Sequence, residues 1–232
     1  MKKLRALLLT CEHGGNIIPE GFRPLFTGDR KVLNSHRGYD IGALEAARLL
    51  ADETGAPLLY YENTRLLIDM NRSEWNRGLF STGEFSLTES DRERLLAELY
   101  RPYRLKVEAA LAKIIRKSGR VVHLAVHSFT PVLHGVVRNA DIGFLYDPAR
   151  KHERDTSHAI RIAFGDECPP YRVRMNYPYR GTSDGLTTSL RKIFPGDTYT
   201  GIECELNQGL LGVTAHRIDV TRRLSLALRS LF

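Results

Sequence analysis

The sequence predicts an α/β fold in which one mixed, mostly parallel sheet carries helices on both faces. Short apolar runs typical of buried strands alternate along the chain with longer segments of helical periodicity. Strands separated by helices are joined by crossovers, and the resulting sheets are covered on both sides. The chain has 232 residues, of which 42% are hydrophobic and 26% charged, so it can bury one full core. We therefore expect residues 1–232 to form a single domain.

The predicted strands are short apolar or alternating runs. They cover residues 4–10, 57–61, 66–70, 121–127, 142–146, 171–176 and 199–207. The last of these carries Glu203 and Glu205, which share one face because side chains alternate along a strand. Glutamate is depleted in strands and is rarely buried without a partner, so the pair predicts a nearby cation or a cleft. A solvated edge strand is the alternative.

The predicted helices have apolar residues at the helical period. They cover residues 41–53, 89–118, 153–164, 185–193 and 213–231. The second begins at a capping box formed by Thr88 and Asp91, an acidic variant of the usual pair. Its apolar face consists of Leu95, Leu96, Leu99, Tyr103, Val107, Ala110 and Ile114. We expect Pro102 to kink or interrupt this helix, because proline lacks the N–H of the helical ladder.

Charge and cysteine content narrow the class of protein. The net charge is +7, but the 34 basic residues are scattered among 27 acidic ones. This favours a small anionic substrate over nucleic acid. Cys11, Cys168 and Cys204 form no CxxC pair, which argues for a reducing, cytoplasmic location and against a thiolate zinc site. No apolar run approaches the roughly 20 residues of a membrane helix.

Polar side chains stand at the ends of two predicted strands. His13 follows the first strand and precedes two glycines, which let the backbone approach a ligand closely. His127 ends the strand at 121–127, near the edge where α/β sheets bind ligands. His123 lies in mid-strand among apolar neighbours, so we interpret it as a core histidine. For His13, an ordinary turn with a solvated imidazole is the alternative.

Short motifs in a fixed order resemble the N-formylglutamate amidohydrolase family. They are EHGG at 12–15, HRGYD at 36–40, RLLIDMNR at 65–72, HS at 127–128 and ELNQ at 205–208. More distantly, the chain is similar to aspartoacylase and the zinc carboxypeptidases. The resemblance spans residues 11–208, and its specificity comes from the order of the motifs. It implies a zinc-exopeptidase-like fold, one zinc ion, and hydrolysis of the amide of a small anionic N-acyl amino acid such as N-formylglutamate.

The resemblance also implies a set of metal ligands. Catalytic zinc takes three protein ligands and keeps one position open for water, and two histidines with a carboxylate supply such a set. His13 and His127 are the first two ligands by this resemblance. The zinc peptidases have a carboxylate three residues after the first histidine, where this chain has Asn16. Asp40 matches an aspartate of the amidohydrolase family and is the preferred replacement, with Glu12 as the alternative. Asp40 could instead cap the helix predicted from residue 41.

The remaining roles come from the same resemblance. Glu205 is the general base, with Glu203 as an alternative because it projects the same way. A base beside a metal that lowers the pKa of water to about 7 can work near neutral pH. Arg65 stabilises the tetrahedral oxyanion, while Asn71 and Arg72 bind a substrate carboxylate. A solvated surface charge is the alternative for each arginine.

Two further features complete the predicted site. Asp69 is expected to orient an arginine or a histidine ligand. Residues 176–185 resemble a substrate loop of the family, and their aromatic, glycine and hydroxyl content suits an active-site wall. Arg180, within this segment, is a candidate for a further anion contact. A turn-rich connection before a helix would have the same composition.

Other functions stay open at the level of sequence. One is an aminoacylase or carboxypeptidase-like activity on another acyl group or a short peptide. A second is a non-catalytic protein that keeps the fold and the metal, and a third is a basic nucleic-acid-binding domain. Metal content together with turnover separates the first two, and salt-dependent retention on DNA would support the third.

Overall fold

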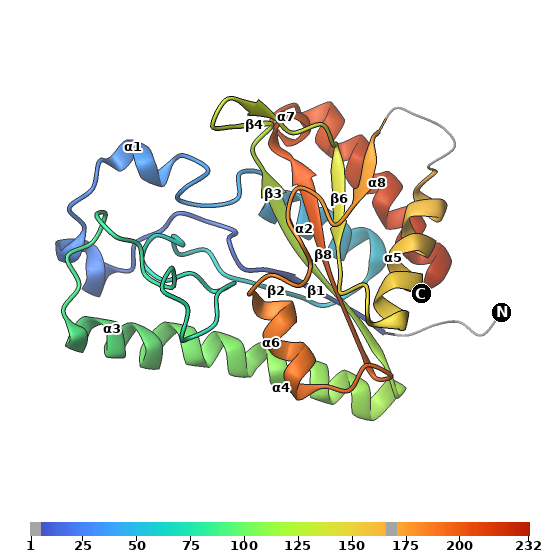
Figure 1. Cartoon of the computed structure of the whole chain (residues 1–232), viewed down its shortest axis with the longest axis horizontal. Helices are drawn as coiled ribbons and strands as arrows, with labels where there is room; N and C mark the ends of the chain where they lie inside the picture. The colour runs from blue at the N-terminus through green and yellow to red at the C-terminus, as the bar shows by residue number, and fades with distance from the viewer. Residues whose placement is uncertain (1–5, 166–170) are drawn as a thin grey trace.

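A computed structural model describes residues 6–165 and 171–232, and its centre is a six-stranded sheet (Figure 1). The strand order is β2-β1-β3-β8-β6-β7, and every neighbouring pair is parallel except β8 and β6. The strands are β1 (Ala6–Cys11), β2 (Leu58–Tyr60), β3 (Val121–Phe129), β6 (Ile142–Leu145), β7 (Val173–Met175) and β8 (Tyr199–Asn207). A separate hairpin pairs β4 (Val132–Leu133) with β5 (Val136–Val137). The predicted mixed, mostly parallel sheet is confirmed.

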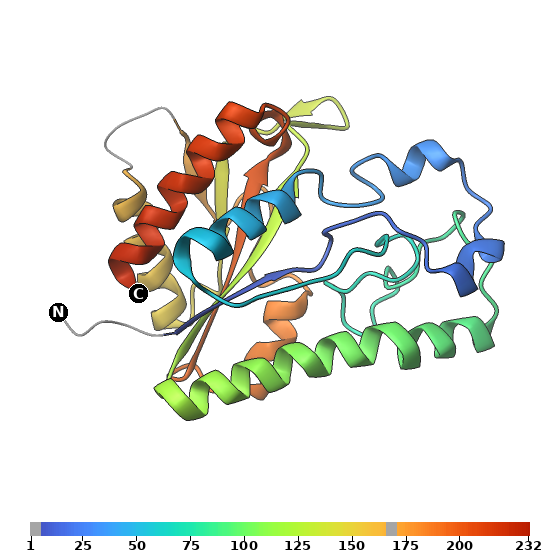
Figure 2. The ribbon, with the colours of Figure 1, turned by 180° about the vertical axis from the view of Figure 1, so that it is seen from behind.

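Helices cover both faces of the sheet, as predicted (Figures 1 and 2). The first face packs against α2 (Ala43–Thr54), α5 (Lys151–Phe164), α7 (Gln208–Leu211) and α8 (Thr214–Leu231). The second packs against α3 (Glu89–Leu95), α4 (Arg101–Ser118) and α6 (Leu186–Ile193). A 3-10 helix (Glu20–Leu25) and α1 (Arg30–Leu33) lie in the long connection after β1. In Figure 1 this connection and residues 61–88 form a lobe of loops beside the sheet.

The long helix predicted at 89–118 is interrupted where expected. Thr88 and Asp91 form the predicted capping box. A π-helical turn (Leu96–Tyr100) then joins α3 to α4, and Pro102 lies in the first turn of α4. Because proline cannot donate to the helical ladder, the wider turn accommodates the missing bond, and the helix continues in nearly the same direction (Figure 2).

The strand predicted at 66–70 is wrong. Its apolar side chains are buried as expected, but the backbone forms turns, with Leu67 N donating to Thr64 O at 3.2 Å and Arg72 N to Asp69 O at 3.1 Å. The segment packs into the core on the α4 side of the sheet. A short buried apolar run has the same sequence pattern in a strand and in a packed loop, so periodicity alone did not separate them.

The remaining expectations concern termini and cysteines. Residues 4 and 5 of the first predicted strand, and Cys168, lie outside the described residues. Cys11 on β1 and Cys204 on β8 are buried free thiols, and β3 lies between their strands. Within residues 6–165 and 171–232, no helix has the length and apolarity that crossing a membrane requires.

The topology brings three polar strand ends to one edge of the sheet. β1, β3 and β8 are parallel, so their carboxyl ends meet at the same edge. Val121 and Tyr199 face the α4 side of the sheet. Side chains alternate along a strand, so His123 and His127 share the face of Val121, and the two glutamates of β8 share the face of Tyr199. The polar side chains of β3 and β8 therefore lie on the α4 side of the sheet, toward its carboxyl edge.

Candidate active site

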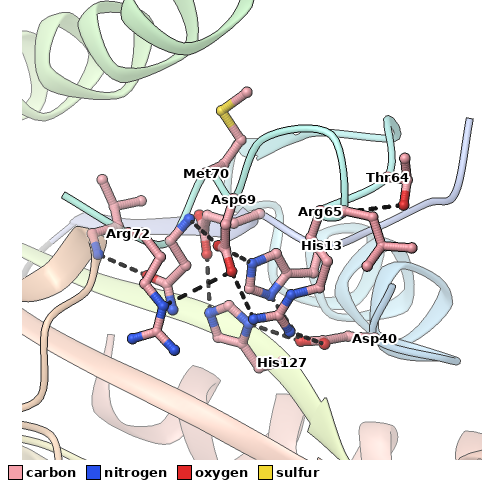
Figure 3. Close-up of polar contacts among 12 residues, drawn as sticks. His13, Asp40, Thr64, Arg65, Asp69, Met70, Arg72 and His127 are labelled. Atoms are coloured by element: carbon pink, nitrogen blue, oxygen red, sulfur yellow. Dashed lines mark hydrogen bonds and ion pairs between the residues drawn. The ribbon is translucent and has the colours of Figure 1, made fainter. Parts of the chain in front are cut away.

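Two histidines and an aspartate converge at the carboxyl edge of the sheet (Figure 3). His13 Nδ1 lies 3.3 Å and His127 Nδ1 2.9 Å from the same oxygen, Asp40 Oδ2. One ligand atom from each of the three residues lies within 4.8 Å of the others, and all three side chains are buried. Two imidazole nitrogens and a carboxylate oxygen in this arrangement could hold a divalent metal ion.

The backbone after β1 explains how His13 and Asp40 meet. Gly14 N donates to Tyr61 O at 2.9 Å, and a Cβ on Gly15 would lie only 2.3 Å from Glu62 O, so this turn lies directly against the chain after β2. Asp40 N donates to His13 O at 2.9 Å, which places the two side chains together. The N-cap of α2 is Gly42, so the alternative interpretation of Asp40 as a helix cap is wrong.

Each imidazole also contacts a second carboxylate through its other nitrogen. His13 Nε2 lies 2.6 Å from Asp69 Oδ1, and His127 Nε2 lies 3.1 Å from Glu12 Oε2. Tyr103 donates to the other oxygen of Glu12 at 3.0 Å. Histidines that bind metals commonly contact a carboxylate in this way, which fixes the ring orientation. Glu12, the alternative third ligand, therefore lies behind His127 and outside the group of three.

In this group, contacts with oppositely charged side chains shift the pKa values more than burial does. Burial alone would raise the pKa of Asp40, but the two histidines and Arg65 hold it well below its usual range. Burial opposes protonation of His127, yet its contacts with Asp40 and Glu12 raise its pKa well above the usual value. A metal cation would compete with protons for the same nitrogen atoms.

Arg65 and Asp69 contact the group of His13, Asp40 and His127 from outside. The guanidinium of Arg65 donates to Asp40 Oδ1 at 3.2 Å and to Asp69 Oδ2 at 2.8 Å. Asp69 therefore contacts both an arginine and a histidine, as predicted. Because Arg65 has two buried carboxylate partners and its side chain is 27% exposed, the alternative of a solvated surface charge is wrong for this residue. That exposed fraction lies on the side of the cavity.

The three preferred metal ligands, both candidate bases and the arginines and asparagine assigned to the site line one cavity of about 220 Å³, whereas Asp69 and Glu12 lie behind the histidines and do not line it. Its lining consists of His13, Asp40, Arg65, Asn71, Arg72, His127, Ser128, Tyr179, Arg180, Ser183, Asp184, Glu203 and Glu205. Of these, Ser128, Tyr179, Ser183 and Asp184 had no individual role in the sequence interpretation. The last three belong to residues 176–185, which we call the pocket wall, and the composition of that segment had indicated their position.

Both glutamates of β8 face this cavity. β8 lies between β3 and β6, so the interpretation of an exposed edge strand is wrong. Glu205 pairs in register with His127, and burial raises its pKa to about 8. Glu205 Oε2 is buried without a hydrogen-bond partner among the described residues. Glu203 Oε1 accepts a hydrogen bond from Thr187 at 2.7 Å.

The pocket wall is fastened to the segment that carries Asn71 and Arg72. Leu186 N, directly after the wall, donates to Asn71 Oδ1 at 2.7 Å, and Arg72 donates to Asp184 O within the wall at 3.1 Å. Asp184 Oδ2 accepts a hydrogen bond from Ser73 N at 3.0 Å. Arg180 is exposed, and in the described part of the chain its side chain has no carboxylate partner. The cavity thus has one arginine fixed by the wall and one that is available to a ligand.

His123 does not take part in this cavity. Its Nε2 lies 2.8 Å from Thr10 Oγ1 and its Nδ1 2.8 Å from the hydroxyl of Tyr199. All three side chains are buried. The interpretation of His123 as a core histidine is confirmed.

Comparison with known proteins gives the following similarities. The family model described as N-formylglutamate amidohydrolase matches residues 5–211. The structure of gene product Atu2144 from Agrobacterium tumefaciens is 30% identical with a TM-score of 0.81, over 97% of this chain and 91% of that chain. An N-formylglutamate amidohydrolase from Ralstonia eutropha is 19% identical with a TM-score of 0.73, over 98% and 93% of the two chains. Among curated protein sequences, none matches.

Proposed function

The chain belongs to the N-formylglutamate amidohydrolase family, and from this premise we propose that it is a zinc-dependent hydrolase of small N-acyl amino acids such as N-formylglutamate. One observation carries the proposal. The buried group of His13, Asp40 and His127 opens into the same cavity as Glu205, whose Oε2 atom has no partner in the described part of the chain. A cation site beside an available carboxylate is the arrangement by which a metal and a general base together activate water for hydrolysis of an amide.

The donor set fits zinc. It combines imidazole nitrogen with one carboxylate oxygen and contains no thiolate, and three protein ligands leave room for water and substrate. The contacts of the far imidazole nitrogens with Asp69 and Glu12 match the usual surroundings of histidine ligands. When bound, the metal would polarise the acyl oxygen and lower the pKa of water.

Glu205 would accept the proton of the attacking water at Oε2. Water adds to the acyl carbon, the C–N bond breaks, and the proton moves to the leaving nitrogen, which gives a carboxylic acid and a free amine. Burial raises the pKa of Glu205, and a nearby cation lowers it again, so a bound metal favours the carboxylate form that the base needs. Glu203 is a weaker candidate for this role, because one of its oxygens already accepts a hydrogen bond from Thr187.

Three arginines would supply the cationic groups. Arg65 is held by two carboxylates at the edge of the metal group, which suits it to stabilise the oxyanion. Arg72 keeps part of its fork free after donating to Asp184, and with Asn71 it would bind a substrate carboxylate. Arg180 would make a further contact with an anion. The size of the cavity, about 220 Å³, favours a small substrate.

The test is metal analysis followed by turnover. We expect the purified protein to retain zinc and to release the acyl group from N-formyl amino acids. A panel of N-formyl, N-acetyl and N-succinyl derivatives would rank the acyl groups and separate this activity from that of an aminoacylase. A protein that binds zinc but hydrolyses none of them would be the non-catalytic homologue. Turnover that survives complete removal of metal would contradict the proposal.

A further inference from the structure

Arg191 lies outside the cavity, has a side chain that is only 7% exposed, and joins the pocket wall to the strand that carries Glu205. Its Nε donates to Glu153 Oε1 at 2.9 Å, and one terminal nitrogen lies 2.9 Å from Glu153 Oε2. The same nitrogen donates to Gly201 O at 3.1 Å. The other terminal nitrogen donates to Gly181 O and, at 3.2 Å, to the hydroxyl of Thr188. One planar guanidinium thus joins α5, α6, β8 and the pocket wall.

The Arg191–Glu153 ion pair supplies hydrogen bonds to the start of β8, where no neighbouring strand pairs on that side. The pairing of β6 with β8 stops at Glu203, so Gly201 has no partner on that side. Its N–H donates to Glu153 Oε1 at 3.3 Å and its carbonyl accepts from Arg191. Glu153 is fully buried and also accepts from Asp147 N at 2.9 Å. The ion pair therefore holds β8 four residues before Glu205.

The pocket wall packs against Tyr146, the residue that follows β6. Asn176 Oδ1 accepts from both Tyr146 N and Gly181 N at 3.0 Å. A Cβ on Gly181 would lie 2.1 Å from Tyr146 N, so the two backbones are in direct contact. Two residues before Gly181 and two after it, Tyr179 and Ser183 line the cavity. The carbonyl that Arg191 holds is therefore at the centre of the wall.

We propose that Arg191, neutralised by Glu153, is a positioning residue that fixes the pocket wall relative to β8 and so sets the cavity in which the substrate binds. The inference rests on the proposed function. A guanidinium presents its donors in a rigid plane, so it holds two carbonyls at a fixed separation. A lysine in the same place keeps the charge beside Glu153 but loses that geometry.

Arg150 provides a matched control for Arg191, because it pairs with the same carboxylate. Its Nε lies 3.5 Å from the same oxygen of Glu153, and its other donors bind the carbonyls of Arg191 and Phe194. In the described part of the chain, it contacts neither Gly181 nor Gly201. Arg191→Lys and Arg150→Lys therefore make the same chemical change beside the same carboxylate, and only the first releases the wall.

The experiment compares the two variants as full-length, zinc-loaded protein acting on an N-formyl amino acid. For Arg191→Lys we expect KM to rise about tenfold with kcat changed by less than about twofold, because a displaced wall weakens binding more than it alters the metal group. Hydrogen exchange at the amides of Gly181 and Ser183 should accelerate in the same variant. Arg150→Lys should leave KM and exchange unchanged, and both variants should retain zinc.

Equal KM values and equal exchange rates in the two variants would overturn the proposal. If Arg191→Lys does not fold, the double variant Glu153→Gln with Arg191→Gln removes both charges, and its matched control is Glu153→Gln with Arg150→Gln. If the wild-type protein turns over none of the substrates, the proposed function fails, but the exchange measurement still decides whether Arg191 holds the wall.

Discussion

His127 Nδ1 lies 2.9 Å from Asp40 Oδ2, although the two residues are 87 positions apart in the sequence. His127 comes from a central strand, whereas Asp40 belongs to the connection that precedes α2. His13 Nδ1 approaches the same carboxylate oxygen from a third segment, at 3.3 Å. Three separate parts of the chain thus place two imidazole nitrogens and a carboxylate oxygen close together, and this donor set supports the proposed metal site.

Replacement of Asp40 by asparagine should remove most of the zinc. Asparagine keeps the shape of aspartate and can still accept hydrogen bonds, but it loses the negative charge that favours binding of a cation. Metal content after gel filtration measures the effect. Asp29→Asn is the control, because Asp29 caps α1 and lies on the surface. Full zinc content in Asp40→Asn would mean that the carboxylate of Asp40 is not a metal ligand.

Glu12→Gln should weaken zinc binding without removing it. Glu12 contacts the far nitrogen of His127, and loss of such a carboxylate typically costs about 10- to 100-fold in metal affinity. Competition with a chelator of known affinity measures the change. The exposed Glu74 provides the control variant Glu74→Gln, which should bind zinc like the wild type. If the two variants bind zinc equally well, Glu12 does not support the metal site.

Arg72→Lys should mainly weaken the binding of substrates that carry a carboxylate. Arg72 donates to Asp184 O, and a lysine cannot keep this bond and also form a bidentate contact with a carboxylate. We expect the KM for an N-acyl amino acid to rise about tenfold, while the KM for its amidated counterpart changes little. Equal effects on both substrates would mean that Arg72 holds the wall rather than the substrate.

His123 should make the stability of the protein depend on pH below neutrality. Burial lowers its pKa to about 4, whereas the unfolded chain has the ordinary value of about 6.5. Between these values the unfolded chain binds a proton that the folded protein does not, so the free energy of unfolding falls as the pH drops from about 6.5 to about 4. The shift corresponds to about 3 kcal/mol.

Urea unfolding of metal-free protein at several pH values in this range measures the effect. In His123→Gln the pH dependence should be flatter than in the wild type, although the variant is less stable at pH 7 because it loses the contacts with Thr10 and Tyr199. His216→Gln, at an exposed position, should keep the wild-type pH dependence. Parallel curves for wild type and His123→Gln would contradict the prediction.

The sequence predicted the parts of the site that follow from strand topology. His13, His127 and Glu205 stand at or near the ends of parallel strands, and the carboxyl ends of such strands share one edge of the sheet. Asp40 and Arg65 come from loops, so only the family resemblance indicated their positions. Propensity and periodicity carry no information on how loops fold over a sheet edge.

Tertiary contacts account for what the sequence did not show. Residues 66–70 have the pattern of a strand but form turns whose apolar side chains pack into the core on the α4 side of the sheet. Glu12 lies next to His13 in sequence yet contacts His127, since successive side chains point in different directions. The link from Arg191 to Gly181 depends on packing between α6 and the pocket wall, and no motif marks it.

Turnover by Glu205→Gln tests the central claim most directly. The claim is that Glu205 moves the proton in a hydrolysis that depends on the metal held by His13, Asp40 and His127. The account predicts that Glu205→Gln keeps the fold and the zinc but loses about 10²- to 10⁴-fold in kcat on an N-formyl amino acid, whereas Glu203→Gln loses much less. Normal turnover by Glu205→Gln, with zinc bound in both variants, would contradict it.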